Sequence, residues 1–499
     1  MRAALGAILS LDPRAPALEF GGIWRSWGDL AASIAAVEQA LDEIRLPPAG
    51  RVGVLLRNHA DIAGALMAIF QSERCLVSFN AVAPEDKLLA DITACEVPVL
   101  IAVAADWRRP GLREAAASSG AAVIALENGA AHLLSRGTPS AWTRSAAPNI
   151  AIEMLTSGTT GVPKRIPLAQ RNFDQALAGG AAFEKDRNSG DTPKLRAGVQ
   201  IVSAPLAHIA GIFGLMNNIL AGRKICLLEK FTVDGFRDAV VRHRPKVAGA
   251  PPAALRMLLD ANIPKEDFAS LVAYRTGTAP LDPDLADEFY TRYGIPVLQN
   301  YGATEFAGGV AGWTMNDFKQ HWAAKRGAVG RLNPGVEGRI TDPETGAVLP
   351  GNAQGLLELR GSNIGNGSDW VRTTDLAVLD ADGFLWIKGR HDGAIIRGGF
   401  KIQPDDILKV IHEHPAVREA AVVGIADRRL GQVPVAAWIA RTGVEVPSEA
   451  ALRDWLRARL LPYQVPMQIL EVSELPRTPS LKVNQPALRA MFEAAANGA

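Results

Sequence analysis

The chain has 499 residues, which is too long for a single hydrophobic core, so we expect two or more domains. Hydrophobic residues make up 48% and charged residues 21%, as is typical of a soluble globular protein. The formal net charge of +1 gives no electrostatic reason to expect a nucleic-acid partner or an anionic membrane surface.

Three cysteines, Cys75, Cys95 and Cys226, lie far apart and form neither a CxxC pair nor a metal-ligand spacing. This pattern indicates buried thiols in a reducing compartment. Asp12 and Arg14 interrupt the apolar N-terminus before a signal-peptide core is complete, and no apolar run reaches membrane-spanning length. We therefore expect a cytoplasmic protein with no membrane span.

In chain order, the N-terminal part alternates between apolar strand patterns and helical periodicity. The expected elements are a hairpin over 18–24, helices over 27–44, 61–70 and 85–93, and strands over 51–56, 75–78 and 97–103. This alternation predicts the α/β class, with mostly parallel sheets flanked by helices. Residues 129–148 are expected to be mostly irregular.

The C-terminal part has the pattern of a separate, smaller domain that mixes helices and strands. Pro404 is placed to open a helix, and Ser448 is placed to cap another. Apolar runs over 417–425 and 433–439 predict two strands between these helices.

A short buried strand over 150–155 ends in nine residues that are rich in glycine and hydroxyl side chains. The run is Thr156-Ser157-Gly158-Thr159-Thr160-Gly161-Val162-Pro163-Lys164. Backbone N–H groups and hydroxyls can donate to an anion with several oxygens, glycine allows close approach, and lysine supplies charge. A nucleotide triphosphate suits such a loop, although it is not the common P-loop, and a simple surface loop is the alternative. Residues 167–173 then lead towards a helix.

A second motif, Tyr301-Gly302-Ala303-Thr304-Glu305, directly follows residues 297–300. An aromatic ring beside glycine offers a stacking face for a base, and the hydroxyl of Thr304 can contact a phosphate. The carboxylate of Glu305 is a hard oxygen ligand of the kind that Mg²⁺ prefers. Taken alone, the five residues could equally form an ordinary strand end.

Both motifs resemble signatures of the adenylate-forming superfamily, close to T-S-G-T-T-G-x-P-K and Y-G-x-T-E. The segment over 371–375 resembles the family's Y-R-T-G-D, with Val371 and Thr374 as departures, and 476–482 resembles P-x-T-x-x-G-K. In this last segment Leu481 stands where glycine is usual. The resemblance covers roughly residues 20–485, with the motifs in family order, and is closest to the acyl-CoA synthetase and aryl-CoA ligase branch.

The resemblance implies a large AMP-binding domain over 1–391 and a small, mobile α+β domain over 392–499, with Asp392 at the hinge. It implies ATP, Mg²⁺ and coenzyme A as cofactors, and the catalytic residues Lys164, Thr304, Glu305 and Lys482, with Glu305 as metal ligand. The nucleotide and coenzyme contacts that it implies are Thr156, Ser157, Gly158, Thr159, Thr160, Gly161, Thr278, Ala279, Tyr301, Asp375, Arg390, Gly398 and Gly399. The acid is expected beside His208, Gly277, Gly302 and Ala307.

The reaction implied is formation of an acyl-adenylate from a carboxylic acid, followed by transfer of the acyl group to coenzyme A. Amino-acid-activating relatives usually carry an aspartate just after the position of His208, and none is present here, so the acid is expected to lack an α-amino group. Aromatic, bulky and fatty acids stay open, as does a homodimer. An acyl-AMP ligase that loads a separate carrier protein and a catalytically inactive binding protein are the alternatives.

Overall fold

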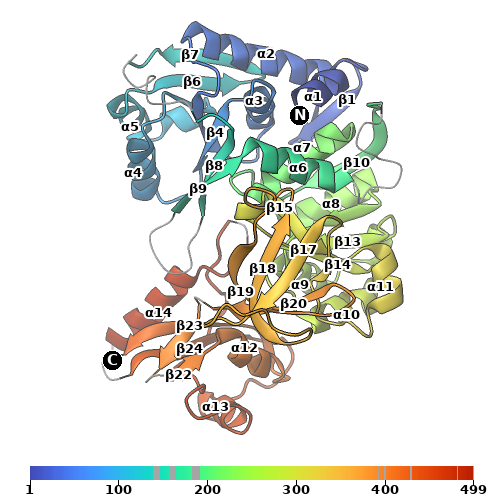
Figure 1. Ribbon diagram of the computed structural model, residues 1–499, viewed down its shortest axis with the longest axis vertical. Helices are drawn as coiled ribbons and strands as arrows, with labels where there is room; N and C mark the ends of the chain where they lie inside the picture. The colour runs from blue at the N-terminus through green and yellow to red at the C-terminus, as the bar shows by residue number, and fades with distance from the viewer. Residues whose placement is uncertain are drawn as a thin grey trace. The chain divides into compact units, whose positions relative to one another are not determined.

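The computed structural model describes residues 1–138, 147–156, 164–181, 192–391, 393–397, 400–427, 430–479 and 481–497 (Figure 1). These residues form two compact units. One lies within residues 1–337 and 360–370, and the other within 338–359 and 371–497. The domain boundary expected at residues 391 and 392 stays a prediction.

The first unit contains a seven-stranded sheet in the order β7-β6-β5-β3-β4-β8-β9 (Figure 1). Its strands are β3 (Arg51–Leu56), β4 (Cys75–Asn80), β5 (Val99–Val103), β6 (Ala122–Glu127), β7 (Ala130–Ser135), β8 (Ile150–Thr156) and β9 (Lys164–Ala169). The five inner strands pair in parallel, whereas β7 and β9 pair antiparallel at the two edges. The expected parallel sheet is thus confirmed.

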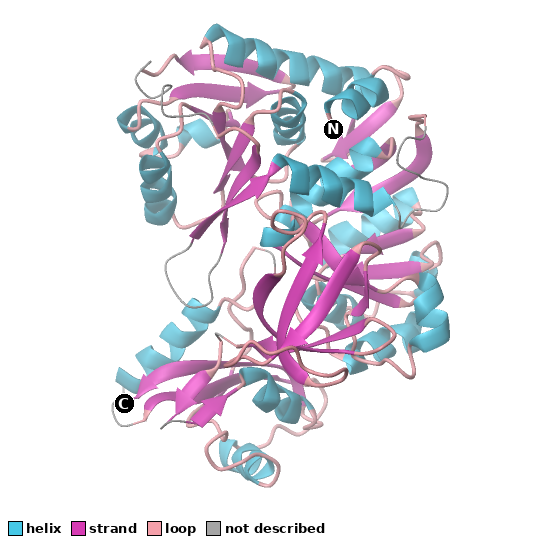
Figure 2. Cartoon of the chain, in the orientation of Figure 1, coloured by secondary structure: helices cyan, strands magenta, loops and turns pink. Residues whose placement is uncertain are grey.

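Helices cover both faces of this sheet, as Figure 2 shows. They are α2 (Trp27–Glu43), α3 (Ala60–Gln71), α4 (Glu85–Cys95), α5 (Leu112–Ser118) and α6 (Gln170–Ala181). Val52, Val54 and Leu56 pack into the apolar cluster that holds α2 and α3, whereas Leu55 packs with α4 and α5. Side chains alternate along a strand, so a strand buried on both faces must be almost continuously apolar, and β3 is.

A second sheet and five strands of a nine-stranded sheet also lie in the first unit, and α1 (Arg2–Leu9) packs into its core. One has the order β10-β11-β1-β2, with β1 (Pro16–Phe20), β2 (Ile23–Ser26), β10 (Arg196–Val202) and β11 (Arg223–Leu227). The other runs from β12 (Val247–Gly249) through β13 (Ala273–Thr276), β14 (Val297–Ala303) and β15 (Gly308–Gly312) to β16 (Gly330–Leu332). Their helices are α7 (Ile209–Leu220), α8 (Val233–His243), α9 (Pro252–Asp260), α10 (Pro283–Tyr293) and α11 (Met315–His321).

The second unit has antiparallel strands followed by a smaller α+β part. The strands are β17 (Val336–Thr341), β18 (Gln354–Gly361), β19 (Val371–Leu379) and β20 (Phe384–Arg390). The first two residues of β17 and the last two of β18 belong to the first unit. The α+β part contains β21 (Ile395–Arg397), β22 (Phe400–Ile402), α12 (Pro404–His412), β23 (Val417–Asp427), β24 (Gly431–Ala440), α13 (Glu449–Arg457), β25 (Ile469–Glu471) and α14 (Gln485–Asn497). The predicted cap is confirmed, because the hydroxyl of Ser448 accepts from the backbone N–H of Ala451.

Two edge strands were not predicted. Within the segment expected to be mostly irregular, residues 130–135 form the strand β7, which pairs with β6 over five residues of each strand. Residues 164–169 form the edge strand β9 before the helix α6 begins at Gln170. Among the described helices, none is both long and apolar enough to cross a membrane.

Candidate active site

The hydroxyl-rich motif is carried by a hairpin. Thr156 ends β8, Lys164 begins β9, and the two residues are register partners across the antiparallel pair. The sheet therefore fixes where both ends of the motif emerge. The predicted contacts Ser157, Gly158, Thr159, Thr160 and Gly161 lie outside the described residues.

His208 stands at the N-cap of α7 with an extended backbone, and its carbonyl accepts from the backbone N–H groups of Gly211 and Ile212. Gly211 is required by this turn, because a β-carbon there would lie 2.2 Å from the carbonyl oxygen of Pro205. The imidazole of His208 is half-buried. Its predicted contact with the acid stays a prediction.

The segment that follows β13 lies against the neighbouring strand β14. These strands are parallel, and Thr276 and Gln299 are their last register partners. A β-carbon on Gly277 would lie 1.8 Å from Oδ1 and 3.1 Å from the carbonyl oxygen of Asn300, so a larger residue would have to displace the side chain of Asn300. Thr278 has a φ of +69°, a left-handed conformation that a β-branched residue rarely adopts. Backbone strain of this kind concentrates at ligand sites.

The second motif turns sharply at the end of β14. Thr304–Phe306 form a single 3₁₀ turn, and Ala307 follows with a φ of +56°. The carboxylate of Glu305 is exposed and Thr304 is half-buried, so both can contact a ligand from solvent. The methyl group of Ala307 is fully buried in the apolar core, which gives this residue a packing role. Tyr301 is half-buried two residues before the end of β14.

The second unit brings Asp375 and Arg390 together. They are register partners on the antiparallel strands β19 and β20. Nη2 of Arg390 donates to Oγ1 of Thr374 at 2.6 Å, and the backbone N–H of Asp375 donates to Oγ1 of Thr373 at 3.1 Å. Thr374 stands where the family has glycine, and its hydroxyl is an additional acceptor that orients the guanidinium of Arg390. A carboxylate and a guanidinium side by side suit a ribose and its phosphate.

Lys482 lies on a tight turn of the second unit. Thr478 and Lys482 close this turn with a backbone hydrogen bond of 2.8 Å, and the backbone N–H of Leu481 donates to the carbonyl of Thr478. Leu481 has a φ of +62°, the conformation that the family's glycine would adopt without strain. Desolvation lowers the pKa of Lys482 from the ordinary lysine value.

Three predicted residues of the second half-reaction, Asp392, Gly398 and Gly399, lie outside the described residues. Their roles as hinge and coenzyme contacts stay predictions.

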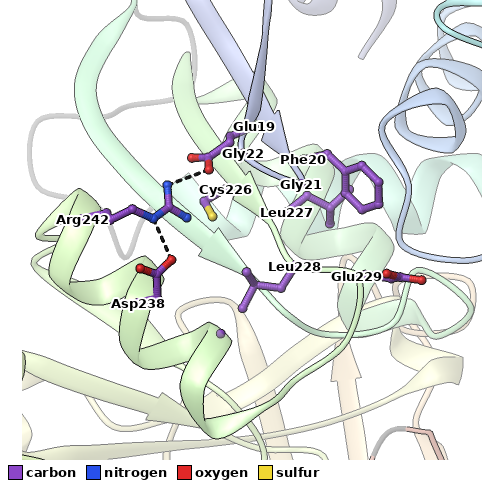
Figure 3. A pocket seen from close by; sticks show the side chains of 11 residues that line it. Glu19, Phe20, Gly21, Gly22, Cys226, Leu227, Leu228, Glu229, Asp238 and Arg242 are labelled. Carbon is purple, nitrogen blue, oxygen red and sulfur yellow. Dashed lines mark hydrogen bonds and ion pairs between the residues drawn. The ribbon is translucent and has the colours of Figure 1, made fainter.

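A cavity of about 580 Å³ lies between β1, β11 and α8, and none of the motif residues lines it (Figure 3). Sequence analysis missed its charged cluster, because Glu19 and Arg242 lie far apart in the chain. Nη1 of Arg242 donates to Oε1 of Glu19 at 2.7 Å, and Nε2 of His243 lies 2.5 Å from Oε2. Glu19, His243 and Cys226 together offer ligand types for a metal ion. The guanidinium on the same carboxylate already supplies a positive charge, so we interpret the cluster as a structural ion pair.

Comparison with known families matches most of the chain. The sequence model described as AMP-binding enzyme matches residues 9–368, and that of the AMP-binding enzyme C-terminal domain matches residues 409–482.

Among curated relatives, 4-coumarate--CoA ligase 5 of Oryza sativa subsp. japonica is 27% identical, covering 94% of this chain and 90% of that protein. 4-coumarate--CoA ligase-like 3 of Arabidopsis thaliana is 29% identical over 66% of this chain and 61% of its own length. The chain thus spans about three fifths of several curated relatives that it matches.

Solved structures share the fold over nearly the whole chain. ATP-bound MatB from Rhodopseudomonas palustris has a TM-score of 0.82 and 26% identity, with 99% of each chain covered. The anthranilate CoA ligase AuaEII in complex with anthranoyl-AMP has a TM-score of 0.79, with 99% of this chain and 98% of that chain covered. At 21% identity this second likeness concerns the fold alone.

Proposed function

The chain belongs to the family of AMP-binding enzymes, and we propose that it is an ATP-dependent, AMP-forming carboxylic acid–CoA ligase. The observation that carries the proposal is the close approach of Gly277, just beyond the end of β13, to Asn300 of the adjacent parallel strand β14, immediately before the Tyr301–Glu305 motif. Ligands of α/β sheets bind at such carboxyl ends. Similarity to CoA ligases and to an ATP-bound structure supports the same assignment.

In the first half-reaction, a carboxylate oxygen of the acid attacks the α-phosphorus of ATP. The bond to the bridging oxygen breaks, and pyrophosphate leaves with the electron pair. An acyl-adenylate forms, in which AMP is a far better leaving group than oxide. Charge accumulates on the phosphoryl oxygens, so catalysis depends on positioning and electrostatic stabilisation.

Within this proposal, Lys164 and the hydroxyls of the first motif hold the β- and γ-phosphates, and Lys482 neutralises charge at the reacting phosphate. Asp375 accepts from the ribose hydroxyls, while Arg390, oriented by Thr374, contacts the ribose or phosphate. Tyr301 and Ala279 contact the adenine. His208, Gly277 and Gly302 contact the acid.

The exposed carboxylate of Glu305 and the hydroxyl of Thr304 suit Mg²⁺, which binds proteins through few carboxylates together with phosphate oxygens and water. When bound, the ion would offset negative charge on the triphosphate. Glu305 and Thr304 would hold it beside the reacting phosphate.

In the second half-reaction, a thiolate of coenzyme A attacks the acyl carbonyl, and AMP leaves as the thioester forms. The C-terminal domain over 392–499 would rotate about Asp392 between the two steps, with Gly398 and Gly399 beside the pantetheine arm. A cytoplasmic location and a homodimer complete the proposal. The three free cysteines, two of them buried, suit a reducing compartment.

The test is pyrophosphate release with ATP and Mg²⁺ against a panel of aromatic, bulky and fatty acids, with and without coenzyme A. Multiple turnovers that require one acid class and coenzyme A would support the ligase. A single turnover that coenzyme A does not change would instead indicate a carrier protein as acceptor. ATP binding without pyrophosphate release from any acid would contradict the proposed function.

A further inference from the structure

Arg165 follows the last residue of the first motif and makes contacts to three other elements. Nη1 donates to the carbonyl of Ser78 on β4 at 3.0 Å and to the carbonyl of Glu153 on β8 at 3.1 Å. Nη2 donates to both carboxylate oxygens of Asp91 on α4, at 2.9 and 2.8 Å. The guanidinium also lies over the ring of Phe79, 5.1 Å from its centroid.

These contacts lie where the sheet divides. The pairing of β4 with β8 covers Leu76 with Ile152 and Val77 with Glu153, although both strands continue for three more residues. At this division the guanidinium of Arg165 donates a hydrogen bond to one backbone carbonyl of each strand. The β8–β9 hairpin continues past this point and carries the first motif. Arg165 therefore connects β4 to β8 at the base of the hairpin, where backbone hydrogen bonds between these two strands end.

The interaction is mostly buried, since the side chains of Arg165 and Asp91 are 16% and 21% exposed. Shortening Arg165 would leave a largely buried carboxylate and two carbonyls without their shared donor. A buried polar group without a hydrogen-bond partner costs free energy, so the surrounding backbone is expected to shift until these groups find other donors. The hairpin edge is the part that can move, because among the described strands β9 pairs with β8 alone.

We propose that Arg165 is a positioning residue for the ATP phosphates: it fixes the direction in which Thr156 and Lys164 leave the sheet. This inference rests on the proposed function of the first motif. Nucleotide contacts made through backbone donors depend on placement, and a displacement of about 1 Å can cost on the order of a hundredfold. AMP lacks the β- and γ-phosphates, so its binding should depend less on Arg165.

Arg51 provides a matched control. Its Nη2 pairs with Glu153 at 2.7 Å, and both side chains are 18% exposed, so the chain contains a second ion pair of similar burial in the same sheet. Arg51 binds the side chain of Glu153 and the carbonyl of Cys95, and does not bridge β4 to β8. The decrease in Tm should therefore be similar for Arg51→Lys and Arg165→Lys.

The experiment measures the Kd of a non-hydrolysable ATP analogue with Mg²⁺, the Kd of AMP, and the Tm, for the native chain and both variants. We expect Arg165→Lys to weaken binding of the ATP analogue about tenfold and AMP less than threefold, while Arg51→Lys changes neither. Equal weakening of both nucleotides, or unchanged binding of the ATP analogue by Arg165→Lys, would overturn the inference.

This outcome is separate from failure of the proposed function. A native chain that binds the ATP analogue, and loses that binding in Arg165→Lys, would support the inference even if no acid were adenylated. A native chain that does not bind the analogue at all would overturn both.

Discussion

Gly302 approaches the backbone of Gly308 so closely that a β-carbon on residue 302 would lie 2.3 Å from the carbonyl oxygen of residue 308. This contact joins β14 to β15 on either side of the turn that carries Thr304 and Glu305. Glycine at residue 302 therefore determines the geometry of the turn between β14 and β15. This structural role is independent of the contact with the acid that is proposed for Gly302.

The first prediction concerns Gly302→Ala. The added methyl group must separate the two strands, so we expect a destabilisation of about 1–3 kcal/mol and a loss of pyrophosphate release on the order of a hundredfold. Gly309→Ala is the control, because its β-carbon would meet the nearest atom at an ordinary 3.7 Å. Equal activity of the two variants would contradict this explanation.

Glu305→Gln tests the metal contact. The side chain is exposed, so its replacement should leave the Tm within about 1 °C, as surface substitutions usually do. Loss of a preorganised electrostatic contact should lower the rate of acyl-adenylate formation about a hundredfold. Raising the Mg²⁺ concentration should restore part of that rate. A normal rate at low Mg²⁺ would exclude Glu305 as the metal ligand.

Leu481→Gly tests the strain in the lysine turn. A leucine at a φ of +62° costs roughly 1–2 kcal/mol of backbone strain, which glycine would remove. Glycine also gives the unfolded chain more conformational freedom, which offsets part of this gain. We therefore expect chemical denaturation to show a stabilisation of about 0.5–1 kcal/mol. Leu481→Ala keeps the strain and should show no gain. Destabilisation by glycine would mean that the leucine side chain contributes packing that exceeds its strain.

The pH dependence of adenylation tests the charge on Lys482. Desolvation lowers the pKa of its ammonium group, so the cation is present below the folded pKa and is lost as pH rises through it. We expect the rate of acyl-adenylate formation to fall at alkaline pH, below the ordinary lysine value of 10.5. Lys482→Arg should react more slowly than the native chain, but its rate should not fall over this alkaline range, because a guanidinium stays charged. An identical alkaline decline in both would assign it to another group.

Asp405→Asn tests a half-buried carboxylate of the second unit. Burial, together with the neighbouring Asp406, raises the pKa of Asp405 to about 6 from 3.8. The folded state therefore holds this proton more tightly than the unfolded state, and the charge costs stability as pH rises from 3.8 to about 6. The variant should be more stable on the order of 2 kcal/mol at pH 8, and unchanged below pH 4. Denaturation at both values measures this, and a gain at the acidic value would contradict the sign.

The main strands, the helices and the order of the motifs could be predicted because local composition determines them. A continuous apolar run such as Val99–Val103 has few alternatives to a strand buried on both faces. The edge strands β7 and β9 could not be predicted in this way. Their residues are less apolar, and Pro167 within β9 is tolerated because an edge strand need not donate on both sides. The pairing partner, rather than intrinsic propensity, makes these residues strands.

By itself the sequence determined which residue types stand at the nucleotide motifs and at the turn that carries Lys482. Only the tertiary structure decided what holds them. Arg390 reaches Thr374 across a strand pair, and Arg165 reaches Ser78 and Asp91 from far along the chain. Such partners are invisible in a single sequence because any carbonyl or carboxylate can accept from a guanidinium. The fold selects one by placing it within hydrogen-bond distance, away from competing water.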